Sequence, residues 1–70
     1  MLNVKKGIQK LISDIYECQK RITINRRFIH DLVLEGREHY TSGLQNEIGC
    51  LQVKIIEFRK ELWENYQYSY

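Results

Sequence analysis

The sequence predicts an all-α fold, an antiparallel helical hairpin packed by coiled-coil-like heptads and paired with a second copy in a four-helix bundle. Two long segments carry apolar residues at alternating steps of three and four, which is the spacing of one helix face. Proline is absent, and only four of the 70 residues are glycine. Hydrophobic residues make up 43% and charged residues 29%, which is typical of a folded chain. Such a short chain forms one domain, and it usually needs a disulfide, a metal or association to be stable.

A seven-residue repeat predicts the first helix over about residues 4–35. Asn25 is the polar residue of this repeat. It is either a tolerated polar residue near solvent or a register device, because a buried amide disfavours alignments that leave it without a hydrogen-bond partner. One position of the repeat holds Ile8, Ile15, Ile22 and Ile29, and the other holds Val4, Leu11, Cys18, Asn25 and Leu32.

The second helix is predicted over about residues 43–66, after a connection at about 36–42. Gly36 suits the left-handed position that ends many helices. Ser42 and Gln45 have the spacing of a capping box, which marks a helix start. An alternative extends the first helix through Gly36 to about His39, with a tight turn at 41–42. Residues 67–70 are expected to fray. The apolar stripe of the second helix is Leu44, Ile48, Leu51, Ile55, Phe58 and Leu62.

The two predicted helices differ in length, which favours association. Folded back, the second helix is expected to reach a point between Ile12 and Glu17, so about 8 to 16 N-terminal residues of the first helix lack a partner within the chain. Exposed apolar surface of this length favours a homodimer of hairpins. The residues expected to support self-association are Val4, Ile8, Leu11, Ile15, Ile22, Asn25, Ile29, Leu51, Ile55, Phe58 and Leu62.

A second apolar set on the later helix, formed by Val53, Ile56, Trp63 and Tyr66, predicts contact with a protein target. Aromatic side chains are enriched at the energetic centres of interfaces. The alternative is that Trp63 and Tyr66 close the end of the bundle. We therefore expect a non-catalytic module that self-associates and binds a macromolecule to regulate or inhibit it. A small chain of this kind fits an accessory protein of a phage or another mobile element, and a structural assembly subunit is a further alternative.

Nucleic-acid binding is the main rival function. Lys20, Arg21, Arg26 and Arg27 lie close together on the first helix, and in a dimer their charges could follow a phosphate backbone. Acidic residues are interspersed among them, however, and the net charge is only +2. The alternative interpretation is an ordinary solvated helix face.

Motifs for catalysis or metal binding are absent from the sequence. Glu35 and His39 are four residues apart, but no zinc motif surrounds them. No glycine-rich phosphate loop or nucleophile elbow appears. We expect no enzymatic activity, no cofactor and no small-molecule substrate.

The two cysteines, Cys18 and Cys50, are too few for a disulfide framework. We expect each to be a small buried hydrophobe. Cys18 is predicted opposite the C-terminal end of the second helix, so an intrachain disulfide with Cys50 is not expected. The sequence has no signal-peptide pattern and no long apolar run, and a cytoplasmic location without membrane binding is predicted.

Overall fold

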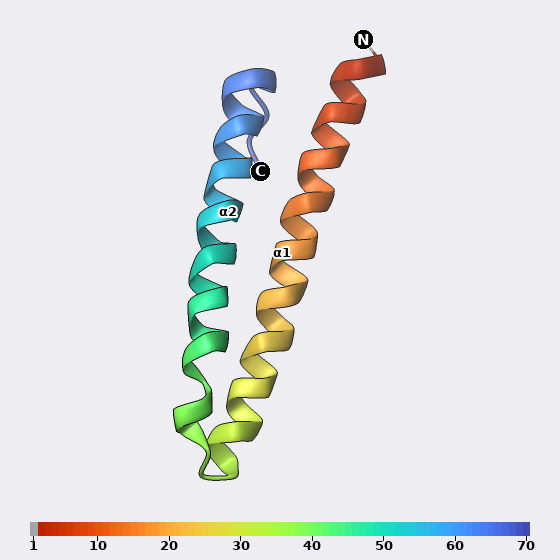
Figure 1. The fold of residues 1–70 in the computed structure, drawn as a ribbon. Coiled ribbons are helices and arrows are strands. Elements are labelled where there is room, and N and C mark those ends of the chain that lie inside the picture. Colours follow the sequence, from red (N-terminus) through yellow and green to blue (C-terminus); the bar gives the residue numbers. More distant parts are fainter. Residues whose placement is uncertain (1) are drawn as a thin grey trace.

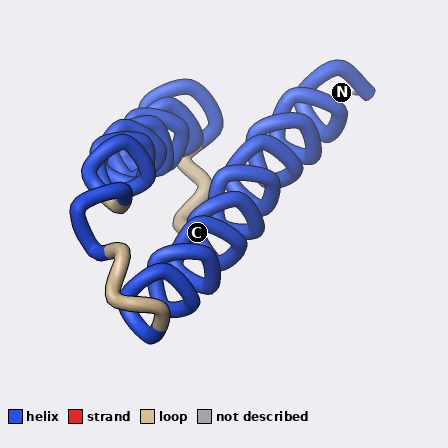
Figure 2. The backbone as a smooth tube through the Cα atoms, turned by 60° about the horizontal axis from the view of Figure 1, so that its bottom comes forward, coloured by secondary structure: helices blue, strands red, loops and turns tan. Residues whose placement is uncertain are grey.

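The computed structural model describes residues 2–70, and it is a hairpin of two long antiparallel helices. Helix α1 spans Leu2–Leu34, the short 3-10 helix η1 spans Glu38–Tyr40, and α2 spans Ser42–Tyr66. The two long helices lie side by side along their length and are joined at one end (Figures 1 and 2). This confirms the predicted all-α hairpin. The molecule measures 53 × 16 × 15 Å, so it is a rod rather than a sphere.

Helix α1 ends where Gly36 was predicted to end it. Gly36 has a positive φ of 73°, which a residue with a side chain rarely adopts. The backbone N–H of Arg37 donates to the carbonyl of Leu32 at 2.8 Å, and that of Gly36 donates to Val33 at 3.0 Å. These two bonds form a Schellman motif, which satisfies carbonyls that the helix end leaves open. The alternative of a first helix that continues to His39 is therefore wrong.

The start of α2 is organised by Thr41 rather than by the predicted capping box of Ser42. The Thr41 hydroxyl donates to the carbonyl of Glu38 at 2.7 Å, and it accepts a hydrogen bond from the Gln45 side chain at 3.2 Å. Thr41 is only 5% exposed, whereas Ser42 is already the first residue of the helix. The predicted capping box of Ser42 and Gln45 is therefore wrong: the residue before the helix is Thr41, whose hydroxyl bonds to both η1 and α2.

The core is the seam between the two helices of one chain. It contains two clusters of buried side chains with half-buried isoleucines, Phe58 and Tyr66 around them. The cluster nearer the open end is Leu11, Ile15 and Leu62, and the cluster nearer the turn is Cys18, Ile22 and Leu51. Most residues that the heptad repeat assigned to self-association thus lie against the other helix of their own chain.

Helix α2 reaches further along α1 than predicted. Tyr66 lies against Gly7, and Leu62 packs with Leu11 and Ile15. The expected end point between Ile12 and Glu17 is therefore wrong, and the N-terminal overhang is shorter than about 8 residues. The connection has about the predicted length, but η1 packs beside α1. Helix α2 therefore begins alongside α1 rather than level with its end, and so it reaches further toward the N-terminus.

Candidate protein-interaction surfaces

The hairpin exposes more large apolar side chains than it buries. Among residues 4–70, six apolar residues are buried, whereas twelve large apolar or aromatic residues are between 39% and 72% exposed. The solvent-accessible surface is 5722 Å², and a compact monomer of this mass would expose about 4,700 Å². The excess of roughly 1,000 Å² is close to the area that one partner buries in a standard protein–protein interface, about 800 Å².

One side of the hairpin carries charges of both signs, and we call it the mixed-charge face. Its centre is an ion pair in which Arg21 Nε donates to Glu47 Oε1 at 2.6 Å across the two helices. The hydrogen bond from Arg21 lowers the pKa of Glu47 below its ordinary value of 4.5, and the nearby charge of Arg21 adds to this shift. Helical spacing places further charges on the same side. These are Lys10, Asp14 and Glu17 on α1, and Lys54, Glu57 and Glu61 on α2.

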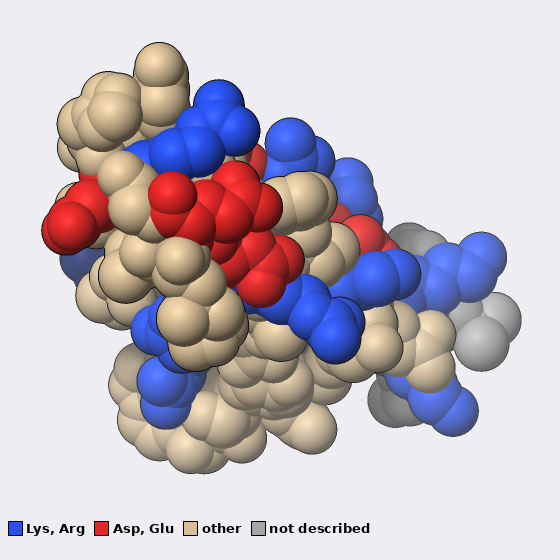
Figure 3. Space-filling model, turned by 90° about the horizontal axis from the view of Figure 1, so that it is seen from below, with Lys and Arg blue, Asp and Glu red and all other residues tan. Residues whose placement is uncertain are grey.

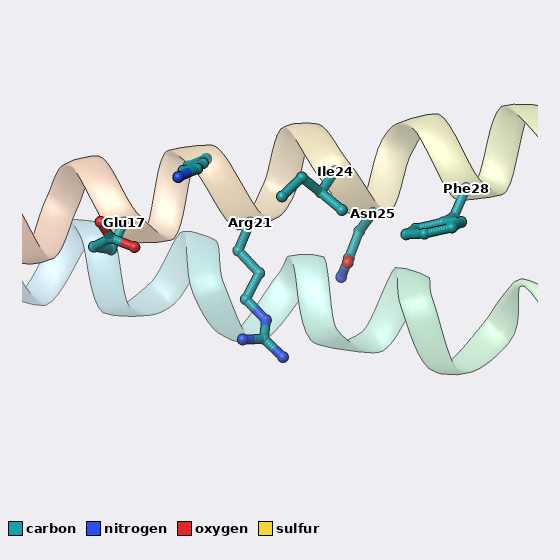
Figure 4. A pocket seen from close by; sticks show the side chains of 6 residues that line it. Glu17, Arg21, Ile24, Asn25 and Phe28 are labelled. Carbon is teal, nitrogen blue, oxygen red and sulfur yellow. The ribbon is translucent and has the colours of Figure 1, made fainter.

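The mixed-charge face contains an open hollow of about 300 Å³ beside Asn25 (Figure 4). Asn25 is 6% exposed, and its Nδ2 makes no hydrogen bond of good geometry among the described residues, although Asn25 lies near enough to the Glu47 carboxylate to help lower the pKa of that group. A buried donor without a partner costs about 1–3 kcal/mol. The remaining residues that line the hollow are Glu17, Lys20, Arg21, Ile24 and Phe28.

Ile24 and Phe28 are the residues of this hollow that sequence reasoning missed. They are 45% and 56% exposed, and both project from α1 beside the hollow (Figure 4). Both fall outside the two heptad positions of the seam. Their spacing of four residues, which places two apolar side chains on neighbouring turns, was the available signal.

The opposite side of the hairpin has no acidic residue, and we call it the acid-free face. Its α1 part follows helical spacing through Ile12, Tyr16, Gln19, Thr23 and Arg26, and its α2 part through Gln45, Gln52, Ile56, Arg59 and Trp63. Seen along the helices from the turn, the Asp and Glu side chains lie across the middle and left of the molecule (Figure 3). In the lower part of this view the described residues are Lys, Arg and uncharged residues.

The predicted target-binding set divides in the structure. Val53, Ile56 and Trp63 are 53%, 65% and 60% exposed on α2. Tyr66 instead packs against the core cluster of Leu11, Ile15 and Leu62 and closes the open end of the hairpin. The alternative that both aromatic residues close the bundle thus fits Tyr66 and not Trp63.

The C-terminal tail is folded back and does not fray as predicted. Gln67 adopts a left-handed conformation with φ of 51°, and the N–H of Tyr68 donates to the carbonyl of Leu62 at 3.1 Å. Arg59 Nη2 then donates to the backbone oxygen of Tyr70 at 3.0 Å. These bonds hold the tail near Trp63, where Tyr68 and Tyr70 line a small hollow with it.

The four basic residues of the nucleic-acid hypothesis do not form one stripe. Arg21 is paired with Glu47 on the mixed-charge face. Lys20 lines the hollow beside Asn25, and Arg27 lines a second one with Asp31. Arg26 lies on the acid-free face. The structure therefore spreads these four charges around α1.

Both cysteines are free, and their surroundings differ. Cys18 is buried beside Leu51, near the middle of α2, so its predicted position opposite the end of that helix is wrong. The longer overlap of the helices explains the shift. Cys50 is exposed, which corrects the expectation that both cysteines are buried. Its position faces away from the seam because it precedes the buried Leu51 by one residue.

Two features are absent from the described residues, 2–70. No group of three His, Cys, Asp or Glu side chains is arranged to hold a metal ion in this part of the chain. Within the same residues, neither helix is long and apolar enough to span a bilayer.

Comparisons of this chain with protein-family models, with curated proteins and with solved structures found no match.

Proposed function

We propose that this chain is a small non-catalytic interaction module that self-associates and covers a surface of a macromolecular target, which it thereby regulates or inhibits. The observation that carries this proposal is the excess of exposed over buried large apolar side chains. Apolar surface of this extent is stabilised when it is removed from water. The hairpin has two such surfaces on opposite sides, and each suits a different kind of partner.

The mixed-charge face suits a second copy of the same chain. In a two-fold interface each residue of one copy meets a residue of the other, so a surface with both signs of charge can be complementary to itself. Phe28 and Ile24 supply exposed apolar area there. A homodimer in which four helices pack together follows from this pairing.

A substitution on each side tests this proposal. Phe28→Asp places a charge in the exposed apolar part of the mixed-charge face and should convert the dimer to a monomer. Ile56→Asp is the matched control, because Ile56 is similarly exposed (65% against 56%) but lies on the other side. Sedimentation equilibrium measures the mass of both variants. A Phe28→Asp protein that remains a dimer would contradict the assignment of this face.

Target binding is tested by Trp63→Ala, which should abolish binding of a target while the dimer survives. Loss of the dimer instead would make Trp63 part of the self-association surface.

Nucleic-acid binding is the less supported function, because the four candidate basic residues lie on different sides of α1. It predicts that Arg26→Ala with Arg27→Ala weakens binding and flattens its salt dependence. Unchanged binding at low salt would end that hypothesis.

A further inference from the structure

From the charge distribution we infer that the acid-free face docks an acidic amphipathic helix of a different protein. This inference rests on the proposed function, since it names the partner chemistry of the same interaction module. Three properties of the face lead to it: its apolar strip, the sign of its charges and the position of its aromatic side chains.

The apolar residues of the face form a strip that follows both helices. By helical spacing, half-buried isoleucines of both helices lie along its middle, namely Ile8, Ile12, Ile48 and Ile55. More exposed side chains lie on either side: Tyr16 on α1, and Ile56 and Trp63 on α2. Two antiparallel helices that share an apolar strip can pack against the apolar stripe of a third helix laid along it. From Ile8 to Thr23 the strip runs for roughly 23 Å, which matches a helix of about 15 to 20 residues.

The charges of the face select an acidic partner. Arg26 and Arg59 lie on the acid-free face, one on each helix, and both are exposed. Helical spacing places Lys5 on the same side of α1. No acidic residue of α1 or α2 lies on this face, so these cations have no carboxylate to pair with there, apart from the bond that Arg59 makes to the tail backbone. Glutamate or aspartate residues flanking the apolar stripe of a docking helix would supply the missing charges.

A second copy of the chain is a poor occupant of this face. Paired about a two-fold axis, the face would bring cations against cations or against glutamines, with no acid to offset them. A flat anionic bilayer would contact the exposed Tyr16 and Trp63 but would leave the half-buried isoleucines uncovered. An acidic helix would cover the isoleucines and would also supply carboxylates to the flanking cations.

The test uses two synthetic 18-residue helical peptides that share one apolar leucine stripe. One carries glutamate at the flanking positions and the other carries lysine. Fluorescence anisotropy of the labelled peptides gives the affinity. Trp63, the only tryptophan of the chain, reports on the site, because its emission should shift to shorter wavelength when a helix covers it. The acidic peptide should bind at least about tenfold more tightly than the basic peptide at low salt, which is the effect of two or three such charge contacts.

Charge-reversed variants locate the binding. Arg26→Glu with Arg59→Glu should lose the preference for the acidic peptide. Lys10→Glu with Lys54→Glu carries the same change of charge, on both helices, but on the mixed-charge face; it should keep the preference. If the first variant does not fold, the inference is tested by the salt dependence of peptide binding to the unaltered chain. Affinity for the acidic peptide must then fall as sodium chloride increases, and constant affinity would overturn the inference.

Other outcomes also overturn it. Equal binding of both peptides would show that charge does not select the partner. A Trp63 emission shift that depends on chain concentration, without peptide, would place a second copy on this face. Stronger binding to anionic vesicles or to a single-stranded oligonucleotide than to the acidic peptide would assign the face to those partners. If the chain dimerises and yet gives any of these results, only this inference is contradicted. If the chain stays monomeric and binds no peptide, the proposed function is contradicted as well.

Discussion

The ring of Tyr66 lies directly over the backbone of Gly7 and holds the open end of the hairpin together. A Cβ atom at position 7 would clash with the Tyr66 hydroxyl and ring. A glycine within a helix costs about 1 kcal/mol relative to alanine, so the contact with Tyr66 is what favours glycine at this point of α1.

This contact predicts non-additive effects of two substitutions. Gly7→Ala should give no gain in stability in the natural chain, because the methyl group displaces Tyr66. In a Tyr66→Ala background the same change should stabilise the fold by about 1 kcal/mol. Gly49→Ala is the control, since nothing lies within 4 Å of its Cβ position. Urea unfolding of the four variants measures the coupling, and additive effects would contradict the contact.

Leu62 and Trp63 are neighbours in sequence with opposite surroundings. Leu62 is 0% exposed and Trp63 is 60% exposed. Leu62→Ala should therefore destabilise the fold by about 2–5 kcal/mol, whereas Trp63→Ala should change stability by about 0.5 kcal/mol or less. Thermal unfolding followed by circular dichroism compares the two. A large loss of stability on removing Trp63 would mean that it is a core residue of an assembly.

Asn25 is predicted to lower the free energy of unfolding and to restrict the helices to a single packing register. Replacing it by leucine removes the buried Nδ2 that lacks a hydrogen-bond partner. Asn25→Leu should raise the free energy of unfolding by about 1 kcal/mol or more. The same change should broaden the distribution of oligomers, because no polar group then penalises alternative alignments. A more stable variant that remains a single species of the original mass would contradict the register role.

The ion pair between Arg21 and Glu47 predicts a dependence of stability on acid. Because the pKa of Glu47 is lower in the folded chain than its ordinary value of 4.5, the pair stabilises the fold above that value. This contribution is lost as the pH falls through the lowered pKa. Glu47→Gln should therefore reduce stability at pH 7 and have less effect at pH 3. Glu57→Gln is the control, since Glu57 is an exposed carboxylate on the same side of α2. An equal effect of Glu47→Gln at both pH values would exclude the pair as a stabilising contact.

The cysteines should differ in reactivity toward a thiol reagent. Exposed Cys50 should react at once, and buried Cys18 only when the hairpin opens. Rates measured on Cys18→Ser and Cys50→Ser separate the two sites. Similar rates in the folded protein would contradict the packing of Cys18 beside Leu51.

Much of the fold was predictable because the heptad positions are nearly all apolar. The spacing of Ile8, Ile15 and Ile22 defines a helix face, and Gly36 marks the end of α1. The extent of overlap was not predictable, because it depends on how the connection, with η1 and Thr41, packs beside α1. The order of the tail was missed for a similar reason: it rests on a left-handed Gln67, which a sequence pattern rarely signals.

The interaction surfaces were only partly predictable. Ile56 and Trp63 stood out as apolar residues away from the seam of α2, and both are exposed. The acid-free face is different, because it combines residues from both helices. Which side of α1 lies beside which side of α2 becomes clear only when a contact such as that of Arg21 with Glu47 is known.

The most direct test of the central claim is the absolute mass of the protein in solution, measured by light scattering after size exclusion over a wide concentration range. One chain has a mass of 8.5 kDa. Self-association through exposed apolar surface predicts twice that mass, with dissociation only on dilution. A mass of one chain at every concentration would contradict self-association and would leave the exposed apolar faces to partners of other sequence.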